Sequence, residues 1–144
     1  PVFASDEEAL AAAEEAYSAY LAMSDLIAQE GGRDPERIAP FVTEEQLEVE
    51  LEGFEALSSL GISQLGSSRV VSSILQSLSG SDVVIYFCVD FGLTKFIQSD
   101  GSALENGRSS DLMTIESQIQ ISPSGALFVD SNTPLEEVVE CLPD

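Results

Sequence analysis

The sequence contains no histidine and no tryptophan, and only 5 of its 144 residues are basic. Without histidine, the chain lacks a common zinc ligand and the imidazole that most often serves as a general base. Its two cysteines, Cys88 and Cys141, form no CxxC pair. The sequence also has no glycine-rich phosphate loop and no G-x-S-x-G nucleophile motif. We therefore expect no metal site and no cofactor.

Positive charge is scarce, whereas acidic residues number 26, so that the formal net charge is −21. Binding to nucleic acid requires clustered lysines and arginines, and anionic membrane surfaces attract the same residues. The charge therefore excludes nucleic acid as a partner. Solubility is the ordinary explanation for such acidity. A salt-adapted host and a basic partner are the alternatives, and the single lysine, Lys95, favours the former.

No stretch approaches the roughly 20 consecutive apolar residues that a membrane-spanning helix needs, so we expect no integral membrane segment. The apolar fraction of 44% is nevertheless enough for a folded core. The length predicts one domain over 1–144, with a core over 6–131 and a tail over 132–144. The chain opens at Pro1 without a methionine or a signal peptide. We expect an extracytoplasmic protein, secreted or lipid-anchored, whose export signal has been removed.

The first segment with helical spacing covers residues 6–29. Ser5 and Glu8 form a capping-box pattern at its start, and a glycine pair at 31–32 ends it. Its apolar residues recur every three or four positions and predict one buried face. These residues are Leu10, Ala13, Tyr17, Tyr20, Leu21, Leu26 and Ile27.

A second helix is predicted between a capping box at Thr43 and Gln46 and a stop at Gly61. Its predicted buried stripe consists of Leu47, Leu51, Phe54, Leu57 and Leu60. Before it, Asp34 and Pro35 predict an N-cap and a short helix through residue 39, which Pro40 interrupts.

Beyond residue 61 the pattern changes from helical to strand-like. Turn residues separate apolar or alternating segments, and residues 103–111 form a polar loop. The predicted strands are 62–78 (long and bulged), 83–91 (central), 94–98, 112–121 and 126–130. Helices followed by antiparallel strands define an α+β fold, in which about four strands form a curved sheet around the long N-terminal helix.

Three stretches carry a resemblance to a known superfamily: AYSAYLAMSDLIAQEGG (16–32) with the helical residues after it, VVIYFCVDF (83–91) and MTIESQIQISPSGALFVDS (113–131). In this order they resemble the NTF2-like, or cystatin-like, cone-shaped α+β superfamily, and within it small exported or lipid-anchored proteins of actinobacteria. The resemblance covers roughly residues 6–131. It implies a sheet wrapped around the first helix, with a pocket at the open end of the cone. Members include ketosteroid isomerases, dehydratases and binding modules, so the fold alone does not select a function.

The catalytic hypothesis rests on Asp90, Tyr17 and Tyr20. Asp90 ends an apolar strand, where desolvation raises the pKa of a carboxyl group. Tyrosines donate to a developing oxyanion in the isomerases of the superfamily, which suggests that role for Tyr17 and Tyr20. The competing interpretation is a solvated strand-end acid and two core tyrosines. The absence of histidine removes the dyad partner that the dehydratases use.

Other acidic residues have simpler explanations. Asp25 could pair with Arg33 or Arg37 or bind a ligand, but a solvated acid on a helix face is the more common case. Glutamates cluster at 44–48 and 136–140 without the pattern of a calcium-binding loop. We expect no calcium site.

The two cysteines leave two alternatives, a disulfide between Cys88 and Cys141 or two separate thiols. The leading functional hypothesis is a non-enzymatic binding or accessory domain. Its expected partners are a second copy, through the sheet, or a small apolar ligand in the cone. A pocket enzyme of the ketosteroid-isomerase type is the alternative.

Overall fold

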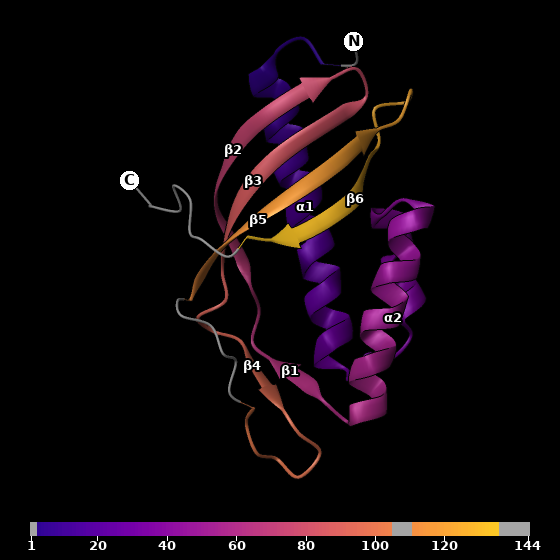
Figure 1. Cartoon of the computed structure of the whole chain (residues 1–144), viewed down its shortest axis with the longest axis vertical. Coiled ribbons are helices and arrows are strands. Elements are labelled where there is room, and N and C mark those ends of the chain that lie inside the picture. The colour runs from indigo at the N-terminus through magenta and orange to yellow at the C-terminus, as the bar shows by residue number, and fades with distance from the viewer. Residues whose placement is uncertain (1–2, 105–110, 136–144) are drawn as a thin grey trace.

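The computed structural model describes residues 3–104 and 111–135 (Figure 1). Within these residues three helices come first and six strands follow. The helices are α1 (Asp6–Gln29), the 3-10 helix η1 (Pro35–Phe41) and α2 (Glu44–Leu60). The strands are β1 (Ser63–Leu65), β2 (Arg69–Ser79), β3 (Asp82–Asp90), β4 (Lys95–Ile97), β5 (Leu112–Ile121) and β6 (Leu127–Pro134). No helix in this part of the chain is both long enough and apolar enough to cross a membrane.

Helix α1 has the predicted bounds. The Ser5 Oγ accepts a hydrogen bond of 3.1 Å from the Glu8 amide, which satisfies one amide that the helix leaves unpaired. Three carboxylates in the first turn complement the positive end of the helix dipole. Its buried residues lie on one side and are Ala9, Ala13, Tyr17, Tyr20, Leu21, Asp25, Ile27 and Ala28.

The short helix differs from the prediction in its type and its length. Asp34 adopts a left-handed conformation (φ 48°, ψ 55°) and makes no side-chain cap hydrogen bond. The segment is a 3-10 helix that includes Pro40 and continues to Phe41. Proline costs one backbone donor here, whereas the completely buried Ile38 anchors the turn in the core. Tertiary packing therefore outweighs the local signal.

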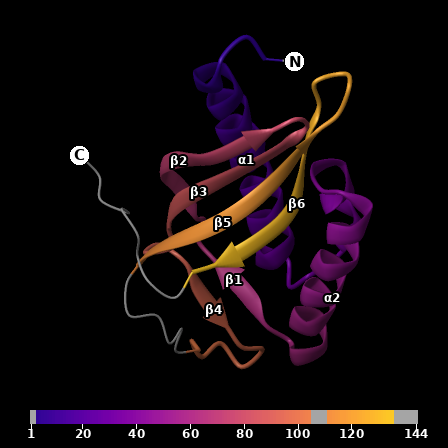
Figure 2. The same cartoon turned by 45° about the horizontal axis from the view of Figure 1, so that its top comes forward.

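Helix α2 starts at the predicted cap, where the Gln46 amide donates to the Thr43 Oγ at 3.2 Å. The predicted buried stripe is wrong at its end, because Leu60 is 69% exposed. Only Gln46 and Phe54 are fully buried on this helix. Helix α2 lies beside the β6 edge of the sheet (Figures 1 and 2), so that one narrow strip of its surface contacts the rest of the fold.

The main sheet has four antiparallel strands in the order β2-β3-β5-β6. It curves around α1 (Figure 2), which confirms the predicted α+β class and the curved sheet on a long N-terminal helix. Strand β3 lies between β2 and β5, and its inward side chains are completely buried, as the apolar sequence 83–91 predicts. The buried inward residues of β3 are Val83, Ile85, Phe87 and Val89.

Three strand predictions need correction. The predicted strand 62–78 is divided into β1 and β2, which belong to different sheets. Strand β4 pairs with β1 in a separate two-stranded ribbon rather than with the main sheet. Strand β6 continues to Pro134, beyond the predicted end at residue 130, because residues 131–134 pair with β5 after a bulge. Of the predicted loop 103–111, residues 105–110 lie outside the described residues, as do residues 136–144 of the predicted tail.

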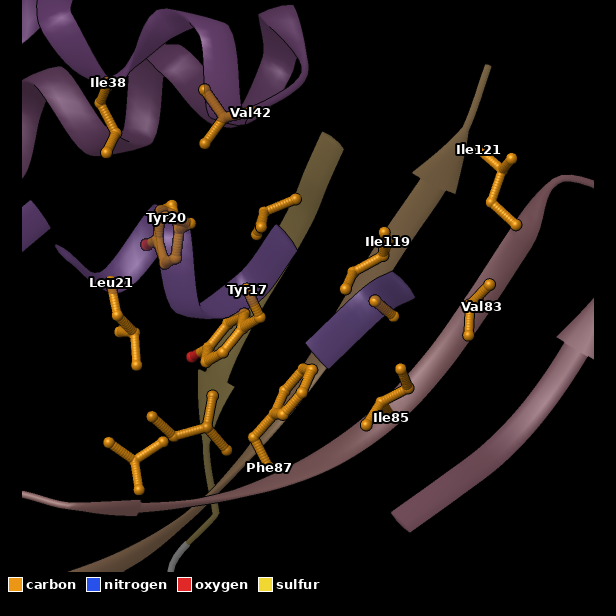
Figure 3. Packing of buried hydrophobic residues seen from close by; sticks show 14 of the residues in the cluster. Tyr17, Tyr20, Leu21, Ile38, Val42, Val83, Ile85, Phe87, Ile119 and Ile121 are labelled. Carbon is orange, nitrogen blue, oxygen red and sulfur yellow. The ribbon is translucent and has the colours of Figure 1, made fainter. Parts of the chain in front are cut away.

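The core lies between α1 and the concave face of the sheet (Figure 3). The Tyr17 ring stacks on the Phe87 ring, with centroids 4.0 Å apart and planes within 5° of parallel. Both side chains are completely buried. Each buries a large apolar area, which contributes on the order of 2–3 kcal/mol per side chain. This pair joins the middle of α1 to the middle of β3.

Gly66 explains why the chain cannot continue from β1 into β2. It has φ of +79°, and an added Cβ would lie 1.9 Å from the Leu93 carbonyl oxygen. The Gly66 carbonyl also accepts hydrogen bonds from Gln29 (2.8 Å) and Gln64 (3.0 Å). The backbone here turns sharply and touches the segment before β4.

Replacing Gly66 by alanine is expected to lower the free energy of unfolding by roughly 2–5 kcal/mol, because left-handed strain adds to a backbone clash. Gly80→Ala is the matched control, since Gly80 also has positive φ (+61°) but nothing within 4 Å of an added Cβ. The control should lose only about 1–2 kcal/mol. Urea unfolding measures both, and equal losses would contradict the role given to Gly66.

Candidate functional site

The structure brings Tyr17 and Tyr20 together inside the fold. Their ring centroids are 5.5 Å apart, and both side chains are buried. The Tyr17 hydroxyl donates to Asn132 Oδ1 at 2.6 Å, and the Tyr20 hydroxyl donates to Glu50 Oε2 at 2.8 Å. The Asn132 amide completes the network with a 3.5 Å bond to the Tyr20 oxygen. Both hydroxyl protons are therefore engaged in hydrogen bonds to acceptors within the protein.

This network connects three elements, with the tyrosines on α1, Glu50 on α2 and Asn132 on β6. Gln46 extends it, because its side-chain amide donates to Glu50 Oε2 at 2.7 Å. Burial raises the pKa of both tyrosines well above the ordinary value, and the negative charge of Glu50 raises it further. The phenols consequently remain neutral donors at physiological pH. Their arrangement is that of a buried structural network.

Asp90 lies on the opposite face of the sheet. Successive side chains of a strand alternate between faces, and Phe87, which faces Tyr17, is three residues away. The Asp90 carboxylate accepts from the Gly92 amide at 2.8 Å and pairs with Arg69 at 3.3 Å. The three residues of the catalytic hypothesis therefore do not converge. Asp90 instead terminates β3 with a local turn.

The sequence suggested that Asp25 is a solvated acid or pairs with an arginine, and the structure shows neither. It is 7% exposed and accepts hydrogen bonds from Gln64 Nε2 (2.9 Å), the Ser68 amide (2.9 Å) and the Ser68 hydroxyl (3.0 Å). Arg37 pairs with Glu30 at 2.7 Å instead. Asp25 thus fixes the connection between β1 and β2 to α1, with three donors in place of a cation.

Cys88 lies in β3 on the face away from α1 and is 4% exposed. Its register partner on β5 is Thr114, which is also buried. Cys141 lies outside the described residues, so the disulfide between these two cysteines stays a prediction. Among the described residues, no group of three or more histidine, cysteine or acidic side chains is arranged to hold a metal ion.

A groove of about 840 Å³ opens at the end of the sheet, where the N-terminal segment meets two hairpin turns. Figure 1 shows these three segments together at the top of the molecule. The lining is mainly apolar and aromatic, with a few polar groups. The described lining residues are Phe3, Leu78, Gly80, Ser81, Gln120, Ile121, Ser122, Pro123 and Phe128. Both the size and the lining are typical of sites for small molecules.

Backbone hydrogen bonds tie the two turns of the groove together. The Ile121 amide donates to the Ser81 carbonyl at 2.7 Å, which links the β5 end to the β2–β3 turn. Within the β5–β6 turn, the Ser122 amide donates to the Ala126 carbonyl at 2.8 Å, and the Ala126 amide donates to the Ser122 hydroxyl at 3.0 Å. The walls are therefore fixed before any ligand binds.

Two other hollows in the described part of the chain are smaller. One of about 520 Å³ lies beside Asp25, between α1 and the start of β2, and includes Arg69. Another of about 330 Å³ lies between α1 and α2 and includes Glu50 and Phe96. The groove is therefore the better candidate site.

No family model matches the sequence, and no curated protein matches it. The fold is similar to that of solved structures. One is the intermembrane space region of the chloroplast protein ARC6, with 14% identity and a TM-score of 0.60, covering 85% of this chain and 93% of that one. Two come from Catenulispora acidiphila at 12% identity, with TM-scores of 0.57 and 0.56 and coverages of 88% and 86% of this chain and 93% and 92% of theirs. The second of these is in complex with S-DNPA. At these identities the similarity establishes the fold alone.

Sequence reasoning missed the groove as a set of residues. Its walls come from three segments separated by many residues, and each contributes only one to three apolar side chains. The available signal was the presence of large apolar residues at element ends, such as Phe3, Leu78 and Phe128. Only the order of the sheet, in which β3 pairs with β5, and the packing of the N-terminal segment on the core bring these residues together.

The buried tyrosines predict a loss of stability at alkaline pH. Above pH about 10 the unfolded chain releases their protons while the folded chain retains them, so unfolding becomes more favourable as pH rises. Each tyrosine contributes up to about 1.4 kcal/mol per pH unit in that range. Urea unfolding at pH 9 to 11.5 measures this slope.

The double variant Tyr17→Phe/Tyr20→Phe should have a shallower slope, since phenylalanine cannot ionise. Tyr86→Phe, on the other face of the sheet, is the control for removing a phenol outside this network. An identical slope in the double variant and the control would contradict the assignment.

Proposed function

We propose that this chain is a non-catalytic binding domain that receives an apolar group in the groove at the end of its sheet. The observation that carries the proposal is the filled interior of the cone. Tyr17 stacks on Phe87, and both tyrosine hydroxyls bond to protein acceptors. The space in which an isomerase would bind its substrate is occupied by side chains of this chain.

The enzyme alternative requires a base and an oxyanion donor that face the same reacting group. Here Asp90 points to the face opposite the tyrosines, and its carboxylate is paired with Arg69. Neither Tyr17 nor Tyr20 has a hydroxyl proton to offer, since Asn132 and Glu50 accept them. These contacts favour binding over catalysis.

Small-ligand binding has support from the comparisons as well as the groove. One structure of similar fold, from Catenulispora acidiphila, is in complex with S-DNPA. This chain has a preformed apolar hollow of about 840 Å³, within the range of small-molecule sites. We assign the groove to ligand carriage or to docking of an apolar group from a partner.

Membership in the NTF2-like superfamily and an extracytoplasmic location belong to the same proposal. The four-stranded curved sheet on a long helix supports the first. The ARC6 region of similar fold is an intermembrane space region, which supports a location outside the cytoplasm for this chain. A disulfide at Cys88 would be stable in such a compartment.

Leu78→Asn is expected to weaken binding of the neutral apolar dye Nile red by about ten-fold, because the substitution places a polar group in the groove wall. Leu60→Asn is the matched control, since Leu60 is also exposed but lies at the end of α2. Fluorescence titration measures both. Equal affinities of the Leu78→Asn and Leu60→Asn variants would contradict a site in the groove. Loss of binding in Tyr17→Phe would instead favour a site inside the cone.

The predicted disulfide has its own test. Intact mass spectrometry after alkylation without reductant should find no modified cysteine, and two modified cysteines after reduction and unfolding. Cys88→Ala should then leave one reactive thiol, at Cys141. Two thiols that alkylate in unfolded protein without reduction would show that the pair is not joined.

A further inference from the structure

The groove has a row of side chains across one end of the sheet. Phe128 on β6 pairs with Gln120 on β5, and Gln120 pairs with Asp82 on β3. Directly paired residues project from the same face of a sheet. Phe128 and Gln120 line the groove, and the exposed Asp82 projects from the same face, beside Gln120. Two interstrand spacings, about 10 Å, separate the backbones of Phe128 and Asp82.

Negative charge also lies on the other side of the groove. Phe3 immediately precedes the first turn of α1, which carries Asp6, Glu7 and Glu8. Three carboxylates outweigh the partial positive charge of the helix end, which is about half an elementary charge. Acidic residues therefore lie in the chain next to Phe3 and beside Gln120, two residues that line the groove.

The described basic residues lie at the other end of the molecule. Arg33 and Arg37 follow α1, whose 24 residues span roughly 36 Å. Arg69 begins β2, at the opposite end from Leu78, and Lys95 begins β4 in the separate ribbon. None of these four lines the groove. A net charge of −21 then acts on a cavity with apolar walls, which focuses the field at the mouth.

From this arrangement we propose that the groove binds a small cationic amphiphile, an apolar chain or ring that carries an ammonium group. The apolar part lies across the end of the sheet, against Leu78 and Ile121 on the face toward α1 and against Phe128 on the opposite face, from which Asp82 also projects. The ammonium group lies toward Asp82. This inference rests on the proposed binding function and names its ligand class.

Two further features favour this class over a neutral or anionic ligand. Aromatic rings line the groove at Phe3 and Phe128, and ring faces attract ammonium groups. The described lining contains no lysine or arginine that could pair with a carboxylate or phosphate. An anionic ligand of the same size would meet Asp82 and the first turn of α1 without a compensating charge.

A series of decyl amphiphiles with one tail and three head groups tests the proposal. The probes are decyltrimethylammonium, decyl maltoside and decyl sulfate, each below its micelle concentration, measured by isothermal titration calorimetry with the full chain. The cation should bind at least about five-fold tighter than the maltoside at low salt, and the ratio should fall as salt screens the carboxylates. Leu78→Asn should weaken binding of both the cation and the maltoside.

Asp82→Asn should reduce the preference for the cation by about two- to five-fold while leaving the maltoside unchanged. Asp34→Asn is the matched control, since it removes the same charge at the far end of α1, where a left-handed residue tolerates asparagine. Equal effects of the two substitutions would overturn the assignment to Asp82. Equal binding of all three probes in the groove would overturn the cationic ligand and retain the binding function. No binding of any probe would remove both.

Discussion

The stacking of Tyr17 on Phe87 is the contact on which the rest of the structure depends. It joins the centre of α1 to the centre of β3, and both rings are completely buried. A buried hydroxyl must have a partner, because leaving it unpaired costs on the order of 1–3 kcal/mol. Asn132 on β6 supplies that partner, and Tyr20 and Glu50 extend the network to α2. The contact between Tyr17 and Phe87 in the core thereby helps to fix the position of α2, a helix that buries little of its own surface.

The same filled core determines where the chain can bind anything. A cone with an empty interior would offer a deep pocket lined by α1, whereas this cone is closed by its own aromatic side chains. Ligand-sized space occurs instead at the end of the sheet, where the hairpin turns and Phe3 form a groove. Asp82 and the acidic first turn of α1 adjoin residues that line it, and none of the described arginines and lysine does so. Composition alone explains the net charge by solubility. At the groove, the same charge is the basis of the proposed preference for a cationic ligand.

Some predictions held because the deciding interactions are local. The caps at Ser5 and Thr43 act over three residues, and both helices begin where the sequence places them. The strand 83–91 was predicted from its apolar run and is central in the sheet. The continuous strand 62–78 failed because Gly66 touches the Leu93 carbonyl, a contact between residues that are distant in sequence. The prediction for Asp25 failed for the same reason, since its hydrogen-bond donors, Gln64 and Ser68, lie about 40 residues further along the chain.

The sequence by itself determined the fold class, the two main helices and the central strands. Periodicity, capping and net charge are properties of neighbouring residues or of composition, and they need no knowledge of distant contacts. Only the tertiary structure decided that β4 pairs with β1, that Asp90 and the tyrosines face apart, and that Phe3, Leu78 and Phe128 share a groove. Each of these depends on which distant segments pack together, because burial and pairing free energies are gained only when the whole sheet closes over α1.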